Sequence, residues 1–184
     1  MDHINDDIIV DRILGGEEEL YKILIDKYKR FAFTLAYNIL NNSEEAEEAA
    51  QDSFIKAFRA LAKFNRQAKF STWLYRIVSN TAITYGRRNK VKKEDIELAK
   101  NISTAPAQNL EKQDQQRFLH QGLSRLGEQD RLVISLFYLK ELSLEEIAGI
   151  MDIKASLVKV KLHRARKRLA NQMQFLLREE ALNL

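Results

Sequence analysis

The 184-residue sequence contains no cysteine, which excludes disulfide bonds and thiolate metal sites and is typical of the reducing cytoplasm. It has one proline, Pro106, and only six glycines, whereas a sheet of short strands needs many turn residues. No apolar run approaches the roughly 20 residues of a membrane span. The acidic N-terminus also lacks the basic and apolar parts of a signal peptide. We therefore expect an all-α, cytoplasmic protein without membrane insertion.

Side chains that could carry catalysis or hold a metal ion are scattered along the sequence. The three histidines lie on different predicted elements, and no glycine-rich phosphate loop is present. The carboxylates of Glu44–Glu48 have no histidines at metal-ligand spacing, and a solvated helix start explains them better than an acid/base pair does. We therefore expect no enzymatic activity, no catalytic residues, no metal and no cofactor.

The net charge of +4 conceals an uneven distribution of charge along the chain. Residues 1–52 hold half of the 26 acidic residues, whereas residues 53–93 are rich in Lys and Arg and contain no acid. This asymmetry indicates two kinds of surface, one for nucleic acid and one for a different partner.

In the first half of the chain, apolar residues recur at the three- and four-residue steps of helices that bury one face. The first predicted helix runs from Glu17 to about Asn41, and the polar residues 41–43 end it and cap the next. The second begins with the acidic turn Glu44–Glu48, which suits the positive end of a helix dipole.

A third predicted helix begins at residue 71 or 72 and ends at Gly86. These three helices would form a first domain, residues 1–90. Residues 91–110 lack the helical periodicity of apolar residues, are polar and contain the only proline. This pattern predicts a flexible linker. Residues 111–184 would then form a second small helical domain.

In the second domain, helices are expected from Leu110 to Leu126 and from Asp130 to Lys140, followed by a helix pair in Ser143–Leu169. Ser143 and Glu146 form a capping box for the first helix of the pair, and a tight turn separates it from the second. The outer face of the second helix is basic, with Lys154, Lys159, Lys161, His163, Arg164, Arg166, Lys167 and Arg168.

A short helix, a tight turn and a basic second helix describe a helix-turn-helix whose second helix enters the DNA major groove. Its first turns would read bases, and Arg166, Lys167 and Arg168 further along would grip phosphates. A basic face is also compatible with solvated surface, and helix-turn-helix pairs occur in proteins that never bind DNA.

The loop Lys63–Phe70 is basic and has an aromatic residue near each end. Aromatic and basic side chains together can stack unpaired bases and hold the phosphates of a single strand. In the helix that follows, Trp73 lies on the apolar stripe and is expected in the core, whereas Tyr75, Arg76 and Asn80 flank the stripe and are candidate contacts.

Three segments resemble the extracytoplasmic-function (ECF) group of bacterial RNA polymerase sigma factors. EEAEEAAQDSFIKAF (Glu44–Phe58) is similar to the acidic segment of that family, and FSTWLYRIVSNTA (Phe70–Ala82) is similar to its F..WLYRIA.N.A motif. LSLEEIAGIMDIKASLVKVKLHRARKRL (Leu142–Leu169) is similar to its C-terminal helix-turn-helix. The resemblance implies two helical domains joined by a linker and a role in promoter-specific transcription initiation.

The resemblance also implies partners and site residues. The partners would be core RNA polymerase, promoter DNA and an anti-sigma factor. Docking on the polymerase would involve Glu45, Glu47, Glu48, Gln51 and Phe54. Melting and holding of the −10 element would involve Lys63, Phe64, Asn65, Arg66, Lys69, Tyr75, Arg76 and Asn80. Recognition of the −35 element would involve Lys159, Val160, Lys161, His163, Arg164 and Lys167.

Two segments depart from the family pattern. The common Thr-Val-Lys-Ser-Arg is Leu-Val-Lys-Val-Lys at residues 157–161, so Val160 offers an apolar contact in place of a hydroxyl. The usual proline after Leu126 is Gly127. A DNA-binding regulator that never docks on polymerase is the main alternative, but it would need neither the acidic segment nor the aromatic-basic loop. An RNA-processing enzyme would require a catalytic group that the sequence does not offer.

Overall fold

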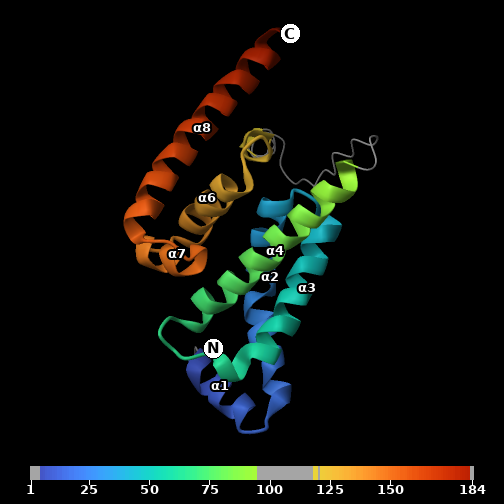
Figure 1. The fold of residues 1–184 in the computed structure, drawn as a ribbon, viewed down its shortest axis with the longest axis vertical. Helices are drawn as coiled ribbons and strands as arrows, with labels where there is room; N and C mark the ends of the chain where they lie inside the picture. Colours follow the sequence, from blue (N-terminus) through green and yellow to red (C-terminus); the bar gives the residue numbers. More distant parts are fainter. Residues whose placement is uncertain (1–4, 95–117, 120, 183–184) are drawn as a thin grey trace.

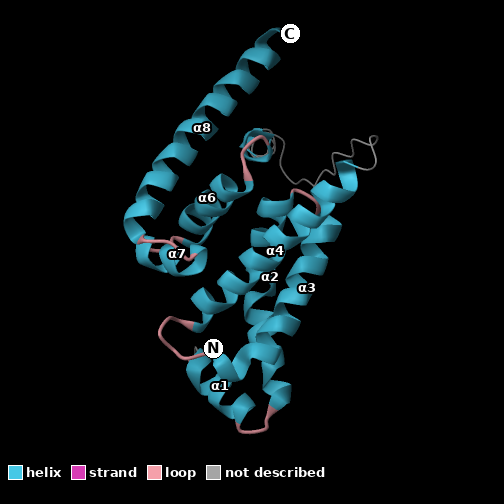
Figure 2. Ribbon diagram, viewed as in Figure 1, coloured by secondary structure: helices cyan, strands magenta, loops and turns pink. Residues whose placement is uncertain are grey.

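The computed structural model describes residues 5–94, 118–119 and 121–182, and every regular element among them is helical (Figures 1 and 2). This confirms the expected all-α class. The elements are α1 (Asp6–Leu14), η1 (Glu18–Leu20), α2 (Tyr21–Leu40), α3 (Ser43–Ala60), η2 (Leu61–Lys63), α4 (Phe70–Glu94), α6 (Glu128–Lys140), α7 (Leu144–Met151) and α8 (Ala155–Leu182).

Helices α2, α3 and α4 pack against one another as the bundle of the first domain (Figure 1). The predicted break between α2 and α3 is confirmed. Asn41 takes the left-handed conformation, φ 55°, which asparagine tolerates better than most residues. The Asn42 side chain then accepts a hydrogen bond from the Glu45 N–H at 3.0 Å and caps α3.

Two boundaries differ from the sequence-based expectation. Helix α1 was not predicted, although Asn5 caps it and Ile9 and Ile13 lie one turn apart on its buried face. Helix α4 continues to Glu94, so the predicted end at Gly86 is wrong. A Cβ on Gly86 would lie 3.4 Å from the Glu128 carboxylate of α6. This glycine therefore allows α6 to approach α4 closely, and it does not end α4.

The second domain contains α6, α7 and α8, and its helix-turn-helix is confirmed. Its inner stripe is as expected, because Val158, Leu162 and Ala165 of α8 are buried. Helix α7 also buries Ile147 and Ile150. Of the predicted linker, residues 91–94 belong to α4, and residues 95–110 lie outside the described residues.

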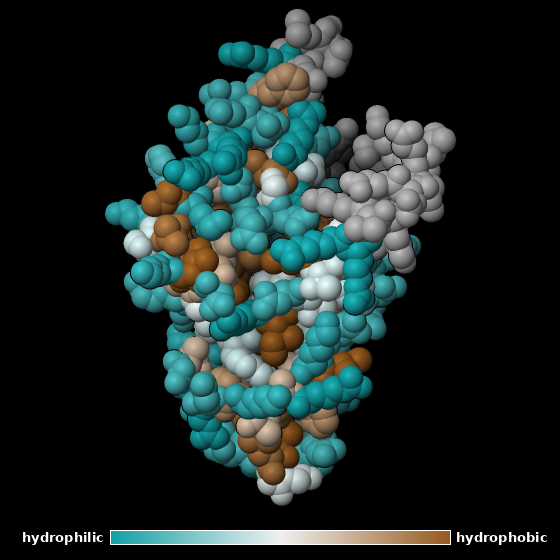
Figure 3. All heavy atoms as spheres, in the orientation of Figure 1, coloured by the Kyte–Doolittle hydropathy of each residue, from teal (hydrophilic) through white to brown (hydrophobic). Residues whose placement is uncertain are grey.

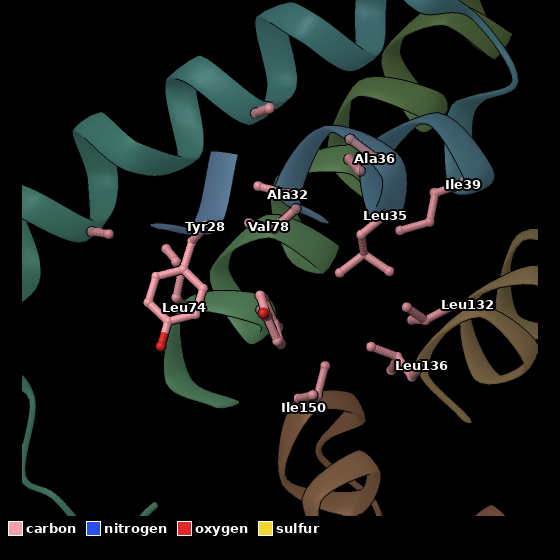
Figure 4. Packing of buried hydrophobic residues seen from close by; sticks show 14 of the residues in the cluster. Tyr28, Ala32, Leu35, Ala36, Ile39, Leu74, Val78, Leu132, Leu136 and Ile150 are labelled. Atoms are coloured by element: carbon pink, nitrogen blue, oxygen red, sulfur yellow. The ribbon is translucent and has the colours of Figure 1, made fainter. Parts of the chain in front are cut away.

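The two domains share one apolar core (Figure 4). Leu35 and Ile39 of α2 face Leu132 and Leu136 of α6, and Ile150 of α7 approaches the same point from below in Figure 4. All five side chains are at most 2% exposed. Helix α6 therefore packs on α2, and α7 packs on α4.

Candidate nucleic-acid interface

The helix-turn-helix is fixed by local hydrogen bonds at both ends of α7. The Ser143 hydroxyl accepts from the Glu146 N–H at 3.1 Å, and the Glu146 carboxylate accepts from the Ser143 N–H at 3.0 Å, so the predicted capping box is confirmed. At the other end Asp152 is left-handed, φ 56°, and its N–H bonds the Ala148 carbonyl. This single left-handed residue turns the chain into α8.

The residues predicted for the −35 element lie together on the outer face of α8. The buried stripe of α8 faces α6 and α7, so the opposite face is turned to solvent. Figure 3 shows mainly hydrophilic side chains over this helix. The exposed members of the predicted set are Lys159, Val160, His163, Arg164 and Lys167, and Lys161 is half-buried. Their contact with DNA remains a prediction.

Two of the three residues expected to grip phosphates contact the protein itself. The Arg166 guanidinium lies 5.0 Å from the Phe137 ring centroid and 5.3 Å from that of Tyr138. Arg168 pairs with Asp130 at 2.6 Å. Both contacts fasten α8 to α6, which leaves Lys167 as the unpaired cation of this turn among the described residues.

The loop Lys63–Phe70 is anchored by its aromatic residues, so Phe64, which was expected to help melt and hold the −10 element, is buried. Phe64 and Phe70 are 8% and 2% exposed. Their ring centroids lie 5.7 Å apart, and the Trp73 ring packs on both at 5.3 and 5.7 Å. These contacts hold the loop against the bundle and leave its polar residues outside.

The exposed residues of this loop and of the start of α4 form the surface that we call the −10 face. Its members are Lys63, Asn65, Arg66, Lys69, Arg76 and Asn80. Arg66 is left-handed, φ 60°, and pairs with Asp11 of α1. Asn65 accepts a hydrogen bond from the Gln67 N–H at 3.2 Å, which shapes the tip.

Tyr75 does not belong to the −10 face, contrary to expectation. It is 2% exposed and packs on Phe31 and Tyr28, with ring centroids 4.6 and 6.0 Å away. Burial raises the pKa of its hydroxyl above the ordinary value. Helix α4 packs against α2, α3 and α7, so it buries more of its circumference than a single stripe.

The predicted polymerase-docking segment lies at the first turns of α3. Glu47, Glu48 and Gln51 are exposed and Glu45 is half-buried. Gln51 donates to the Glu47 carboxylate at 3.4 Å. Phe54 is only 7% exposed, so its side chain belongs to the core and not to a docking surface.

Several interactions at these surfaces were missed by the sequence analysis. Lys69 pairs with Glu146 of α7 at 2.8 Å, and Arg76 pairs with Asp152 at 2.9 Å. Arg131 of α6 donates to the Ile39 carbonyl at the end of α2, at 2.6 Å. These contacts join the two domains. Local sequence patterns do not predict pairs of residues so far apart in the chain.

Within the described part of the chain, no His, Asp and Glu side chains group as a metal site. None of the helices described here is long and apolar enough to cross a bilayer.

The helix-turn-helix with its basic outer helix, joined to a bundle with a separate basic face, defines a two-domain DNA-binding protein. Residues 24–91 match the family model described as Sigma-70 region 2, and residues 119–169 match Sigma-70, region 4.

Relatives match over nearly the whole chain. The RNA polymerase sigma-H factor of Pseudomonas aeruginosa is 33% identical, over 95% of this chain and 96% of that protein. The ECF RNA polymerase sigma factor SigW of Bacillus subtilis is 31% identical, over 90% and 95%. The ECF RNA polymerase sigma-E factor of Escherichia coli K12 is 32% identical, over 96% and 98%. The chain therefore belongs to the ECF group of the sigma-70 family.

Solved structures share the fold. The sigma factor RpoE of Bartonella quintana, in complex with the anti-sigma factor NepR, superposes with a TM-score of 0.71 at 23% identity, over 84% of this chain and 96% of that chain. CnrH in complex with the cytosolic domain of CnrY gives a TM-score of 0.66 at 19% identity, over 91% and 96%.

The aromatic anchor predicts different effects for two neighbouring loop residues. Phe64→Ala should lower the free energy of unfolding by about 3 kcal/mol, because it removes a buried ring from the aromatic cluster. Asn65→Ala, at the exposed tip, should change it by less than about 0.5 kcal/mol. Urea denaturation of both variants measures this, and equal midpoints would contradict the assignment of Phe64 to the core.

Proposed function

We propose that this protein is a dissociable specificity subunit that binds core RNA polymerase and directs it to promoters. The observation that carries the proposal is the presence of both sigma-70 regions, region 2 and region 4, in one chain. A simple DNA-binding regulator would need the helix-turn-helix alone.

Each surface has a proposed role. The outer face of α8 reads the −35 element, because recognition helices enter the major groove by their first turns. The −10 face holds the non-template strand through its cations. Since Phe64 and Tyr75 are buried, the exposed polar side chains Asn65 and Asn80 are the candidates for contact with extruded bases.

The acidic start of α3 is the proposed docking site for polymerase, together with Gln51. An anti-sigma factor is a further proposed partner, since the sigma factor RpoE, which has this fold, was solved bound to one.

Transcription in vitro tests the proposed function. Core polymerase supplemented with the purified chain should give transcripts whose mapped start sites share two upstream elements. Core polymerase alone should not give them. Transcripts that are the same with and without the chain would refute the proposal.

Docking on polymerase should depend on the exposed carboxylates of α3. The double variant Glu47→Lys/Glu48→Lys should lose most of its capture by core polymerase, because it reverses the charge of the proposed site without touching the core. The matched control is Glu18→Lys/Glu19→Lys, which makes the same change at the exposed η1. Equal capture of the two double variants in a pull-down would contradict the site.

The outer face of α8 should contain two kinds of DNA contact. Arg164→Ala should weaken promoter binding by about 1–3 kcal/mol and relax the base preference at one position of the −35 element, as expected for the loss of a bidentate contact to guanine. Lys167→Ala should weaken binding to all sequences about equally. It should also lower the slope of the logarithm of the binding constant against the logarithm of the salt concentration by about one. The measurement is holoenzyme binding to single-base −35 variants at two salt concentrations.

Arg178→Ala is the control for this experiment, since Arg178 is an exposed arginine three turns beyond Lys167 on the same helix. If Arg164→Ala and Lys167→Ala each reduce binding to every −35 variant by the same factor, α8 binds the DNA phosphates electrostatically and does not recognise the base sequence.

A further inference from the structure

Two exposed apolar side chains interrupt the basic outer face of α8. Leu157 is 50% exposed and Val160 is 44% exposed. In the described part of the chain, neither belongs to the shared apolar core or to the half-buried residues packed on it. Single exposed apolar residues are common on protein surfaces, but these two lie three residues apart on the face proposed to contact DNA.

The geometry of α8 directs both side chains away from the protein. The buried stripe of Val158, Leu162 and Ala165 marks the inner side of the helix. With 3.6 residues per turn, Val160 lies roughly opposite the centre of this stripe, and Leu157 lies about 60° around the helix from Val160. Helix α8 begins at Ala155, so both residues belong to its first two turns. These are the turns with which a recognition helix contacts base edges.

An apolar side chain has one good partner on the base edges of the major groove, the 5-methyl group of thymine. The other groups at these edges are hydrogen-bond donors and acceptors, which lose their bonds to water when an apolar side chain covers them. The methyl group belongs to one strand only, so contact with it also distinguishes a T·A pair from an A·T pair. Leucine and valine at these positions therefore favour thymine.

The spacing of the two side chains matches the stacking of base pairs. Three residues of an α-helix rise about 4.5 Å along its axis, whereas neighbouring base pairs are stacked about 3.4 Å apart. Leu157 and Val160 can therefore contact adjacent base pairs at the same time. The exposed cations Lys159, Arg164 and Lys167 surround them on α8 and attract the phosphates that flank the groove.

We propose that Leu157 and Val160 select thymine 5-methyl groups on two adjacent base pairs of the −35 element. This inference rests on the proposed function and names bases that α8 recognises in the promoter. The cations of the same face supply affinity for any sequence, because they bind phosphates. The two apolar contacts supply sequence preference, because only thymine has the methyl group that they bury.

Replacement of thymine by uracil tests this inference, because uracil lacks only the 5-methyl group and still pairs with adenine. The promoter is one identified by the start-site mapping described above, and the protein is holoenzyme assembled from core polymerase and the full chain. Each thymine of the −35 element, in either strand, is replaced in turn. Uracil in two adjacent base pairs should each weaken holoenzyme binding by about two- to fourfold, as expected for the loss of one buried methyl group. Uracil at the other positions should have no effect.

Serine variants connect each methyl group to one side chain. Leu157→Ser and Val160→Ser remove the apolar contacts without touching the buried stripe of α8. Each variant should lose the uracil effect at one of the two positions and keep it at the other. The matched control is Leu177→Ser, which makes the same change at a leucine that is 55% exposed on the same helix. Leu177 lies about 30 Å beyond Leu157, so this variant should keep both uracil effects.

Two further measurements separate methyl recognition from other roles of the same side chains. Neither Leu157 nor Val160 has a charge, so their serine variants should leave the salt dependence of promoter binding unchanged. Capture of core polymerase in the absence of DNA should also be unchanged. Loss of this capture in Leu157→Ser or Val160→Ser, but not in Leu177→Ser, would overturn the inference, because the apolar pair would then contact protein.

The outcomes also separate this inference from the proposed function. Unchanged binding at every uracil substitution would overturn the inference, and so would a −35 element that contains only G·C pairs. Uracil effects of the same size in the unaltered chain and in both serine variants would overturn it as well. If the holoenzyme binds no promoter at all, the proposed function fails instead.

Discussion

Burial of Leu35 and Ile39 beneath Leu132, Leu136 and Ile150 holds the two domains in one body. Each fully buried aliphatic side chain contributes about 1.5–3 kcal/mol relative to exposure. The exposed ion pairs that flank this core contribute little after solvent screening. Apolar packing therefore supplies most of the stability of the contact between the two domains, and the ion pairs lie at its edge.

Helix positions and ends followed from local chemistry, so most of the fold could be predicted. The capping box at Ser143 and the left-handed Asn41 depend on residues within one turn, which a sequence displays directly. Gly86 misled the prediction, because a glycine that ends a helix and a glycine that admits a neighbouring helix look the same in sequence. The neighbour, Glu128 of α6, comes from the other domain.

The candidate site could be predicted only where a single helix face defines it. The outer face of α8 is such a case, since its buried stripe fixes which side chains point outward. Phe64 and Tyr75 were misplaced because α4 and its preceding loop are covered on several sides by elements distant in sequence. The Lys69–Glu146 pair joins residues 77 positions apart, and periodicity carries no information on such contacts.

The packing of the two domains leaves the two proposed partner surfaces in different states. The acidic first turns of α3 are exposed and make no ion pair with the second domain among the described residues, whereas two cations of the −10 face, Lys69 and Arg76, are paired with its acids. The proposed docking surface for polymerase is therefore accessible while the two domains are packed together. Salt weakens the Lys69 and Arg76 pairs and the competing phosphate contacts alike, so ionic strength alone does not favour separation of the domains. Separation requires a partner that binds the separated domains better than the packed domains, which is the thermodynamic condition for any ligand to shift such an equilibrium. Polymerase satisfies this condition if it binds both domains at a separation that breaks the shared core.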